Sequence, residues 1–163
     1  MAHVMGSDVR RHASCYISAA VEQTIATGAG YTNALDDGSS PATTTAVLLQ
    51  DFTHTSPGRL TYTGVHDMDF NVDAHVSLIP GSASGIVWTL AIYHYDASGA
   101  SGAVVPDSLI ERRTAATTVA AASVGTLINL STNDYIELHM KHDDGGQNQD
   151  MTVSKMMFKI TEV

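Results

Sequence analysis

Histidine pairs are the first residues in this sequence that suggest chemistry, because imidazole binds metal ions and transfers protons near neutral pH. His139 and His142 are three positions apart, with Met140 and Lys141 between them. On a β-strand this spacing places the two rings on opposite faces, so they cannot bind the same metal ion. Because the surrounding residues are typical of a strand, we expect no metal site at this pair.

Oxygen-rich side chains gather in the segment 143–150, which reads Asp-Asp-Gly-Gly-Gln-Asn-Gln-Asp. A calcium loop of the EF-hand type needs acidic residues at alternate positions and a closing glutamate. The segment lacks that pattern, so a solvated turn between two strands is favoured. Binding of an ion by this loop stays open as the alternative.

Two further histidine and carboxylate combinations occur, His66-Asp-Met-Asp69 and Tyr93-His-Tyr-Asp96. With eight histidines in 163 residues, such neighbours are expected by chance. The sequence contains no nucleophile elbow, no zincin helix and no glycine-rich phosphate loop. We therefore assign no catalytic residue, no metal ligand and no cofactor, and expect a non-enzymatic protein.

An enzyme acting on polysaccharide is the least favoured of three functional hypotheses, because it would need two carboxylates facing each other across a groove.

Aromatic residues on the expected strands are the remaining candidates for binding. They would suit a carbohydrate platform, but aromatics in strands more often pack in a core or against another subunit. We expect contacts with a second subunit or with another protein at five of them: Trp88, Tyr93, Tyr95, Tyr135 and Phe158. Sugar binding is the minority hypothesis.

Charge and composition exclude several classes of function. The net charge is −9, and the only basic pairs are Arg10-Arg11 and Arg112-Arg113, so a Lys/Arg face for nucleic acid is missing. No run approaches the roughly 18 apolar residues that span a bilayer, and the first residues do not resemble a signal peptide. The single Cys15 cannot form an internal disulfide, and we expect an inert buried thiol.

Hydrophobic residues recur with period two, which predicts β-strands. In Phe70–Leu78 the apolar side chains alternate with polar ones, whereas Ile86–Tyr95 is apolar on both faces and is expected to be central or at an interface. Further strands are expected at Ile17–Ile25, Thr45–Phe52, Arg59–Tyr62, Leu109–Thr114, Thr117–Leu130, Tyr135–His142 and Thr152–Ile160. The alanines of 115–122 would also suit a short helix, but the neighbouring Thr and Val residues favour a strand.

This number of short strands, separated by Gly, Pro, Asn and Asp turns, predicts an all-β antiparallel sandwich of about eight to ten strands, and specifically a jelly roll. At this length one globular domain is expected. Within it we expect an extended N-terminal arm with the first strands at 1–45, and the jelly roll proper at 46–163.

Four segments carry a resemblance to a known family: Gly58-Arg-Leu-Thr-Tyr-Thr-Gly64, Phe70–Leu78, Asn133-Asp-Tyr-Ile-Glu-Leu138 and Met156-Met-Phe-Lys-Ile160. In this order they resemble the jelly roll of the complement-head and tumour-necrosis-factor-like (TNF-like) superfamily, and most of all its versions in tailed-bacteriophage virion proteins. The resemblance covers about residues 50–163. It implies a ten-stranded sandwich that trimerises through apolar strand faces. The absence of collagen repeats and disulfides sets the chain apart from animal members.

Two functional hypotheses follow from this resemblance. The first is a capsid decoration or cement protein, made in the host cytoplasm, which oligomerises as a trimer, or alternatively a dimer, and binds over the joints of the major capsid protein on the outer surface of the virion. Its acidic charge suits that surface because it limits adhesion to DNA. The alternative is the receptor-binding or glycan-binding head of a tail fibre or spike. No nucleic-acid or membrane partner is expected.

Overall fold

The computed structural model describes residues 10–26, 30–39, 41–55, 57–81, 85–143 and 146–163. The described residues form thirteen strands, β1 (His12–Ile17), β2 (Val21–Ile25), β3 (Thr32–Asn33), β4 (Thr44–Gln50), β5 (Phe52–Thr55), β6 (Arg59–Tyr62), β7 (Met68–Pro80), β8 (Val87–Tyr95), β9 (Gly102–Val104), β10 (Ile110–Arg113), β11 (Ala120–Leu130), β12 (Tyr135–His142) and β13 (Gln149–Glu162), and one short 3₁₀ helix, η1 (Pro106–Ser108).

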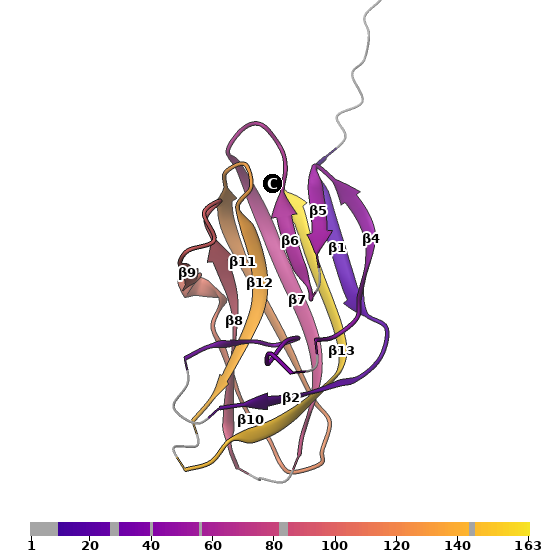
Figure 1. The fold of residues 1–163 in the computed structure, drawn as a ribbon, viewed down its shortest axis with the longest axis vertical. Helices are drawn as coiled ribbons and strands as arrows, with labels where there is room; N and C mark the ends of the chain where they lie inside the picture. Colours follow the sequence, from indigo (N-terminus) through magenta and orange to yellow (C-terminus); the bar gives the residue numbers. More distant parts are fainter. Residues whose placement is uncertain (1–9, 27–29, 40, 56, 82–84, 144–145) are drawn as a thin grey trace, which may run out of the picture.

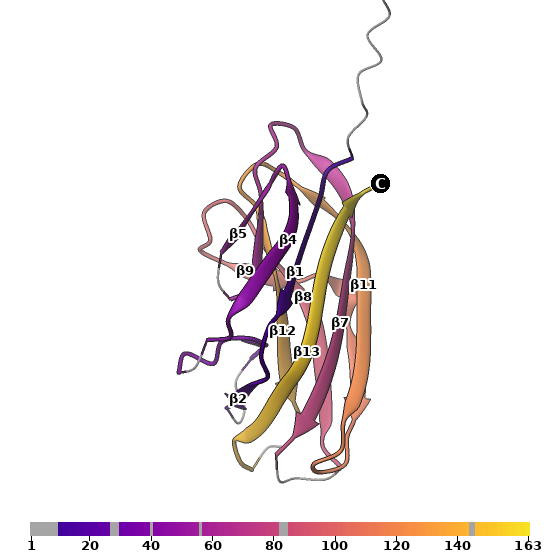
Figure 2. The same cartoon turned by 90° about the vertical axis from the view of Figure 1, so that its right-hand side faces the viewer.

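Two antiparallel sheets stack face to face (Figure 1). Sheet A has the strand order β11-β7-β13-β1-β4, with β2 beside β13. Sheet B has the order β10-β8-β12-β6-β5, with β3 beside β12 and β9 beside β8. Figure 2 looks onto sheet A, where β4, β1, β13, β7 and β11 lie side by side. The predicted all-β jelly roll is therefore confirmed, with five main strands in each sheet.

Most of the expected strands are present, some with different ends. β6 and β12 begin and end where the sequence predicted, whereas Ile17–Ile25 is not one strand. There β1 ends at Ile17 and β2 begins at Val21, and the two pair with different parts of β13. The alanine-rich segment is a strand from Ala120 onward, because its alternate side chains are buried against the other sheet. The helical alternative is wrong.

Alternate side chains of the long strands fill the space between the sheets. In β7, Phe70, Val72, Ala74, Val76 and Leu78 all point into the core, as the period-two pattern predicted. The side chains between them, Asn71, Asp73, His75 and Ser77, lie on the outer face of sheet A. The rings of Phe52, Tyr62 and Phe70 pack together at one end of this core with centroids 5.1–5.3 Å apart.

Trp88 and Phe158 belong to this core, with exposed fractions of 1% and 0%. Our expectation that they contact a second subunit or another protein is therefore wrong. In β8 both faces are apolar in sequence, so the pattern could not show which face points inward. Trp88 lies on the face shared with Leu90 and Ile92, and that face packs against sheet A.

The segment 1–45, expected as an arm with the first strands, contributes to both sheets where it is described. β1 lies between β13 and β4 in sheet A, and β3 pairs with β12 in sheet B. Ala34 and Leu35, next to β3, are buried in the core. The described residues between 10 and 45 thus contribute strands to both sheets and side chains to the core, and residues 1–9 lie outside the described residues.

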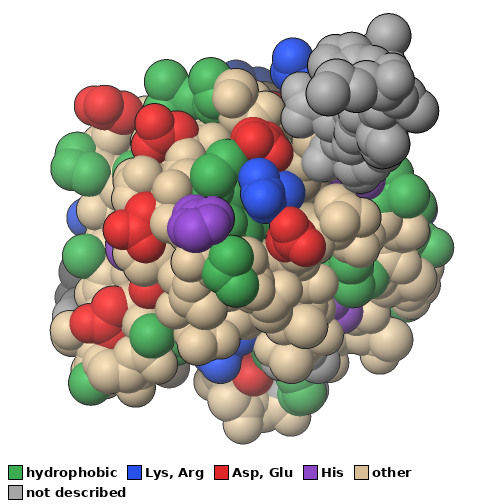
Figure 3. Space-filling view, turned by 90° about the horizontal axis from the view of Figure 1, so that it is seen from above, with side chains coloured by type: hydrophobic (Ala, Val, Ile, Leu, Met, Phe, Trp, Pro, Cys, Tyr) green, Lys and Arg blue, Asp and Glu red, His purple; other side chains and the backbone are tan. Residues whose placement is uncertain are grey.

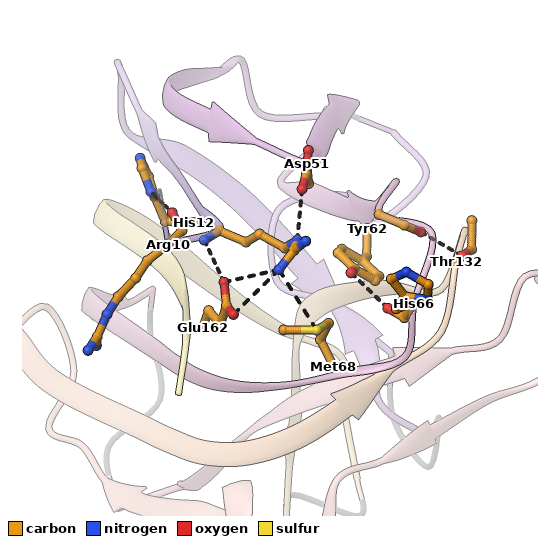
Figure 4. A network of polar contacts seen from close by, with 10 residues as sticks. Arg10, His12, Asp51, Tyr62, His66, Met68, Thr132 and Glu162 are labelled. Carbon is orange, nitrogen blue, oxygen red and sulfur yellow. Dashed lines mark hydrogen bonds and ion pairs between the residues drawn. The ribbon is translucent and has the colours of Figure 1, made fainter. Parts of the chain in front are cut away.

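Asp51, Met68 and Glu162 come together at the end of the sandwich where the chain ends (Figure 4). The side chain of Arg11, the residue before β1, contacts all three. Its Nε donates to Asp51 Oδ2 at 2.8 Å, between β4 and β5, and its Nη1 lies 3.4 Å from both carboxylate oxygens of Glu162 in β13. The same Nη1 lies 3.8 Å from the sulfur of Met68 in β7. Asp51 has a positive φ of 58°, a conformation that Asp tolerates better than most residues, and this contact helps to hold it there.

Cys15 lies on the inner face of β1 with no exposed surface and no disulfide. Burial raises the pKa of its thiol to about 12, so the thiolate is not formed at neutral pH. The expectation of an inert buried cysteine is confirmed.

Candidate functional site

Five rings lie together on the outer face of sheet B as two stacked pairs joined by tilted contacts, and we call them the ring cluster: Tyr31, Tyr93, His139, Tyr95 and Tyr135. Tyr93 stacks on His139 with ring centroids 4.1 Å apart, and Tyr95 stacks on Tyr135 at 4.6 Å. The Tyr95 and His139 rings are 6.1 Å apart and join the two stacks, and Tyr31 lies 5.5 Å from Tyr93. The register positions the stack, because β8 supplies Tyr93 and Tyr95 beside Glu137 and Tyr135 of β12.

A cation covers each end of the ring cluster. The guanidinium carbon of Arg59, from β6, lies 3.9 Å from the centroid of the Tyr135 ring. The ammonium of Lys141, from β12, lies 4.7 Å from the centroid of the Tyr31 ring. Both are cation–π contacts, which favour a fixed arrangement of the rings. The ring faces are thus occupied by one another and by the cations.

Glu137 is a buried carboxylate beneath these rings, only 5% exposed. Its Oε1 accepts a hydrogen bond from Arg59 Nε at 2.8 Å, and its Oε2 accepts one from His139 Nε2 at 3.0 Å. Burial by itself would raise the pKa of Glu137, but the hydrogen bonds from His139 and Arg59 lower it below its ordinary value. Glu137 is therefore ionised at neutral pH and fixes both partners.

Partial burial raises the pKa of Tyr93, Tyr95 and Tyr135, so their hydroxyl groups stay protonated at neutral pH. Neutral tyrosine rings held rigidly on strands are a common feature of protein contact surfaces, because they lose little conformational entropy on binding. These three side chains are half-buried on one face. The structure therefore brings together three of the five residues that the sequence proposed as contacts.

A glycine makes room for the stack at its β9 end. Gly102 is the cross-strand partner of Tyr95, and a Cβ at Gly102 would lie 2.3 Å from Cε1 of the Tyr95 ring. No side chain other than hydrogen fits there without moving the ring. The ring cluster therefore depends on Gly102 as well as on its own residues.

Sheet A has a different character, because large apolar side chains are exposed along both of its edge strands. At one edge, Val47, Leu48 and Leu49 of β4 are 61%, 55% and 44% exposed. At the other edge, Leu127 of β11 is 66% exposed. Met157 of β13 is exposed between them. We call Val47, Leu48 and Leu49 the β4 group. We call the exposed side of β11 that carries Leu127 the β11 edge.

Neither edge strand of sheet A carries a charge. β4 reads Thr-Thr-Ala-Val-Leu-Leu-Gln and β11 reads Ala-Ala-Ala-Ser-Val-Gly-Thr-Leu-Ile-Asn-Leu. Each pairs with a single neighbour, β1 or β7, which leaves its other side without a strand partner among the described residues. Exposed edge strands are usually protected by lysine, proline or a bulge. The pairing of β4 with β1 has a bulge at Val47, whereas β11 pairs with β7 in continuous register. These two edges are the kind of surface that another chain covers.

The histidines occupy separate environments. His139 is in the ring cluster, whereas the His142 ring packs against Trp88 with centroids 5.4 Å apart, so the two lie on opposite faces of β12 as predicted. His94 pairs with Asp134 at 2.9 Å. His66 accepts a hydrogen bond from the Tyr62 hydroxyl through its backbone carbonyl, at 2.8 Å (Figure 4).

Among the described residues there is no group of three or more His, Cys, Asp or Glu side chains placed to hold a metal ion. In the 143–150 loop, Asp143 accepts a hydrogen bond from the backbone N–H of Val87, and residues 144–145 lie outside the described residues. No helix in the described part of the chain is long and apolar enough to cross a membrane. Figure 3 shows acidic, basic and apolar side chains interspersed over the end of the sandwich near the last residue.

Sequence reasoning missed Tyr31, Arg59, Glu137 and His139 as members of a surface cluster. Tyr31 precedes β3 in a segment expected to be an arm, and Arg59 reaches the cluster from β6. The alternation in Tyr135–Lys141 does place Tyr135, Glu137, His139 and Lys141 on one face of a strand. The sequence therefore showed that these four side chains share a face, but it did not show that β12 pairs with β8.

No protein-family model and no curated protein matches this sequence. Solved structures do match its fold. The Eiger TNF of S. frugiperda has a TM-score of 0.60 at 11% identity, covering 94% of this chain and 92% of its own. Murine APRIL, solved at pH 5.0, has a TM-score of 0.60 at 7% identity, covering 94% of this chain and all of its own. The protein thus has a TNF-like jelly-roll fold.

Proposed function

We propose that this protein is a non-enzymatic structural protein that forms a homotrimer through sheet A and decorates the outer surface of a bacteriophage capsid. The observation that supports self-association is the pair of exposed apolar edges on sheet A. Burial of such surface stabilises an assembly by about 25 cal/mol per Å² removed from water, before the costs of association.

The position of the two edges favours a ring over a two-fold dimer. The β4 group and the β11 edge lie at opposite ends of the strand order β11-β7-β13-β1-β4. When one edge of a copy covers the other edge of the next copy, the contact is head-to-tail, and it gives a ring when the rotation between copies closes. A trimer is the ring that the sequence resemblance to the TNF-like superfamily implies. A dimer is the alternative.

The second contact, with the major capsid protein, is assigned to the ring cluster on sheet B. In an assembly held together by sheet A, sheet B faces outward and stays accessible. Tyr93, Tyr95 and Tyr135 are half-buried, rigid and neutral, and Arg59 and Lys141 flank them. Tyrosine and arginine are enriched among the residues that dominate protein binding energies. The phage origin itself is supported by the sequence resemblance.

Co-sedimentation tests this proposal. Purified protein is mixed with capsids that lack it, and its mass in solution is measured by light scattering. We expect saturable binding of an oligomer, with loss of binding for Tyr93→Ala. Binding should be unchanged for the control Thr53→Ala, an exposed residue on the edge strand β5 of the same sheet. An oligomer that does not bind capsids contradicts the decoration role.

A receptor-binding or glycan-binding head is the second candidate, and one observation favours it. Beside the ring cluster, sheet B has a depression of about 400 Å³ with charged and hydroxyl-bearing side chains. In the same experiment, an oligomer that ignores capsids and binds host cells would support this candidate.

A further inference from the structure

A depression lies on the outer face of sheet B at the Lys141 end of the ring cluster. It has a volume of about 400 Å³ and is lined by Val87, Thr89, Glu111, Lys141, His142 and Asp143. The size falls within the range of small-molecule sites. Three strands supply these residues: β8 provides the floor, and β10 and β12 provide the two walls.

The register explains how the depression forms. Thr89 of β8 is the direct cross-strand partner of both Glu111 in β10 and Lys141 in β12. Because neighbouring strands are about 4.8 Å apart, the two charged residues are rooted about 10 Å from each other. The short side chains of Val87 and Thr89 leave the space between them open, wide enough for one hexose ring.

The charged groups of the walls do not neutralise each other. Among the described residues, neither Glu111 nor Lys141 forms an ion pair. The Lys141 ammonium lies 4.7 Å from the centroid of the Tyr31 ring, and Lys141 also lines the depression. Carboxylate and ammonium groups thus face a common space as an acceptor and a donor.

We propose that this depression binds one uncharged hexose unit of a glycan. Glu111, Asp143 and Lys141 bring two carboxylates and one ammonium to it, so there is no excess of positive charge to attract a phosphate or a sugar acid. The ring of His142 packs against Trp88 on the other face of β12. A neutral hexose has a rim of hydroxyl groups, which carboxylates and ammonium groups bind well, and C–H faces, which suit the Val87 floor. This inference gives the second candidate function a location and does not depend on self-association.

Saturation-transfer NMR and isothermal titration of the full chain test the site, with glucose, galactose, mannose and N-acetylglucosamine as probes. We expect saturable binding of at least one of them. Glu111→Gln and Lys141→Met are each expected to weaken that binding by about tenfold or more, because a hydrogen bond to a charged group is lost. Matched controls are Glu22→Gln on β2 and Lys155→Met on β13, which lie away from the depression and are expected to leave binding unchanged.

Two outcomes would overturn the site: no saturable binding of any of the four sugars, or equal binding by wild type and the double variant Glu111→Gln/Lys141→Met. Far-ultraviolet circular dichroism of each variant shows whether it is folded. Light scattering on the same samples measures the oligomeric mass independently of sugar binding. A trimer that binds no sugar would overturn only the sugar site.

Discussion

Sheets A and B differ in how the large side chains at their surfaces are covered. On sheet B, the rings of Tyr31, Tyr93, Tyr95 and Tyr135 cover one another, and cations close both ends of the stack. On sheet A, the β4 group and Leu127 are exposed, and no described part of the chain covers them. The comparison teaches that the rings of sheet B are held in place within one chain, whereas the exposed apolar edges of sheet A are the surface expected of a subunit interface.

Both faces depend on one core, and Trp88→Ala is the change with the largest expected effect on folding. The Trp88 ring is buried between the sheets, so its removal leaves a large cavity. We expect a loss of about 3–5 kcal/mol in the free energy of unfolding, measured by urea denaturation. A loss below about 1 kcal/mol would mean that Trp88 lies outside the core and that the opposite face of β8 packs against sheet A.

Glu137→Gln tests whether the outer face of sheet B stabilises the single chain. Because the folded-state pKa of Glu137 lies below its ordinary value, its ionised form contributes stability that is complete above the ordinary carboxyl range. That contribution is lost as the pH falls through this range to the lower folded pKa. We expect the variant to lose about 1.5–3 kcal/mol at pH 7, with a smaller difference from wild type at pH 4.

The matched control for Glu137→Gln is Glu111→Gln, an exposed carboxylate on the same sheet. We expect it to change the free energy of unfolding by less than about 0.5 kcal/mol. Equal effects of the two substitutions, or a Glu137→Gln effect that does not depend on pH, would show that the buried carboxylate does not organise this face.

Gly102→Ala tests the packing of the ring cluster. The new Cβ would overlap the Tyr95 ring, which has to move away from Tyr135. We expect a loss of about 1–2 kcal/mol and a changed near-ultraviolet circular dichroism signal from tyrosine. Gly30→Ala is the control, because a Cβ there meets no atom within 4 Å. If the two variants behave alike, Tyr95 does not depend on Gly102.

Val47→Thr is expected to have the smallest effect on folding, because the side chain is largely exposed in the single chain. We expect a change below about 0.5 kcal/mol in dilute solution. At higher protein concentration the wild type should gain thermal stability from association, and the variant should gain less. Differential scanning calorimetry over a range of concentrations measures this, and a wild-type melting temperature independent of concentration would contradict the subunit interface.

Local alternation was enough to predict the strands, because each strand of a sandwich has one buried face. Phe70–Leu78 and Tyr135–His142 show this plainly, and Gly and Asp turns marked their ends. The break between β1 and β2 was missed because Ser18, Ala19 and Ala20 carry no strong turn signal. The break lies where β1 stops pairing with β13, and because this pairing joins opposite ends of the chain, a local pattern could not show it.

The candidate site was only partly predictable, for a related reason. Tyr93, Tyr95 and Tyr135 were identified by residue type, but their neighbours depend on strand register, which one sequence does not show. Trp88 is aromatic like the three tyrosines, but it lies in the core. In a strand with two apolar faces, only the packing of the other sheet decides which face is buried. Arg59 and Tyr31 reach the ring cluster from β6 and from the residue before β3.

Light scattering coupled to size-exclusion chromatography tests the central claim, that sheet A is a subunit interface, most directly. We predict a wild-type mass three times the chain mass of 17.2 kDa. Leu48→Glu and Leu127→Glu, one at each edge of sheet A, are each predicted to give the monomer, whereas Thr61→Glu on sheet B keeps the trimer. A monomeric wild type, or a trimer that survives both edge substitutions, would contradict the account.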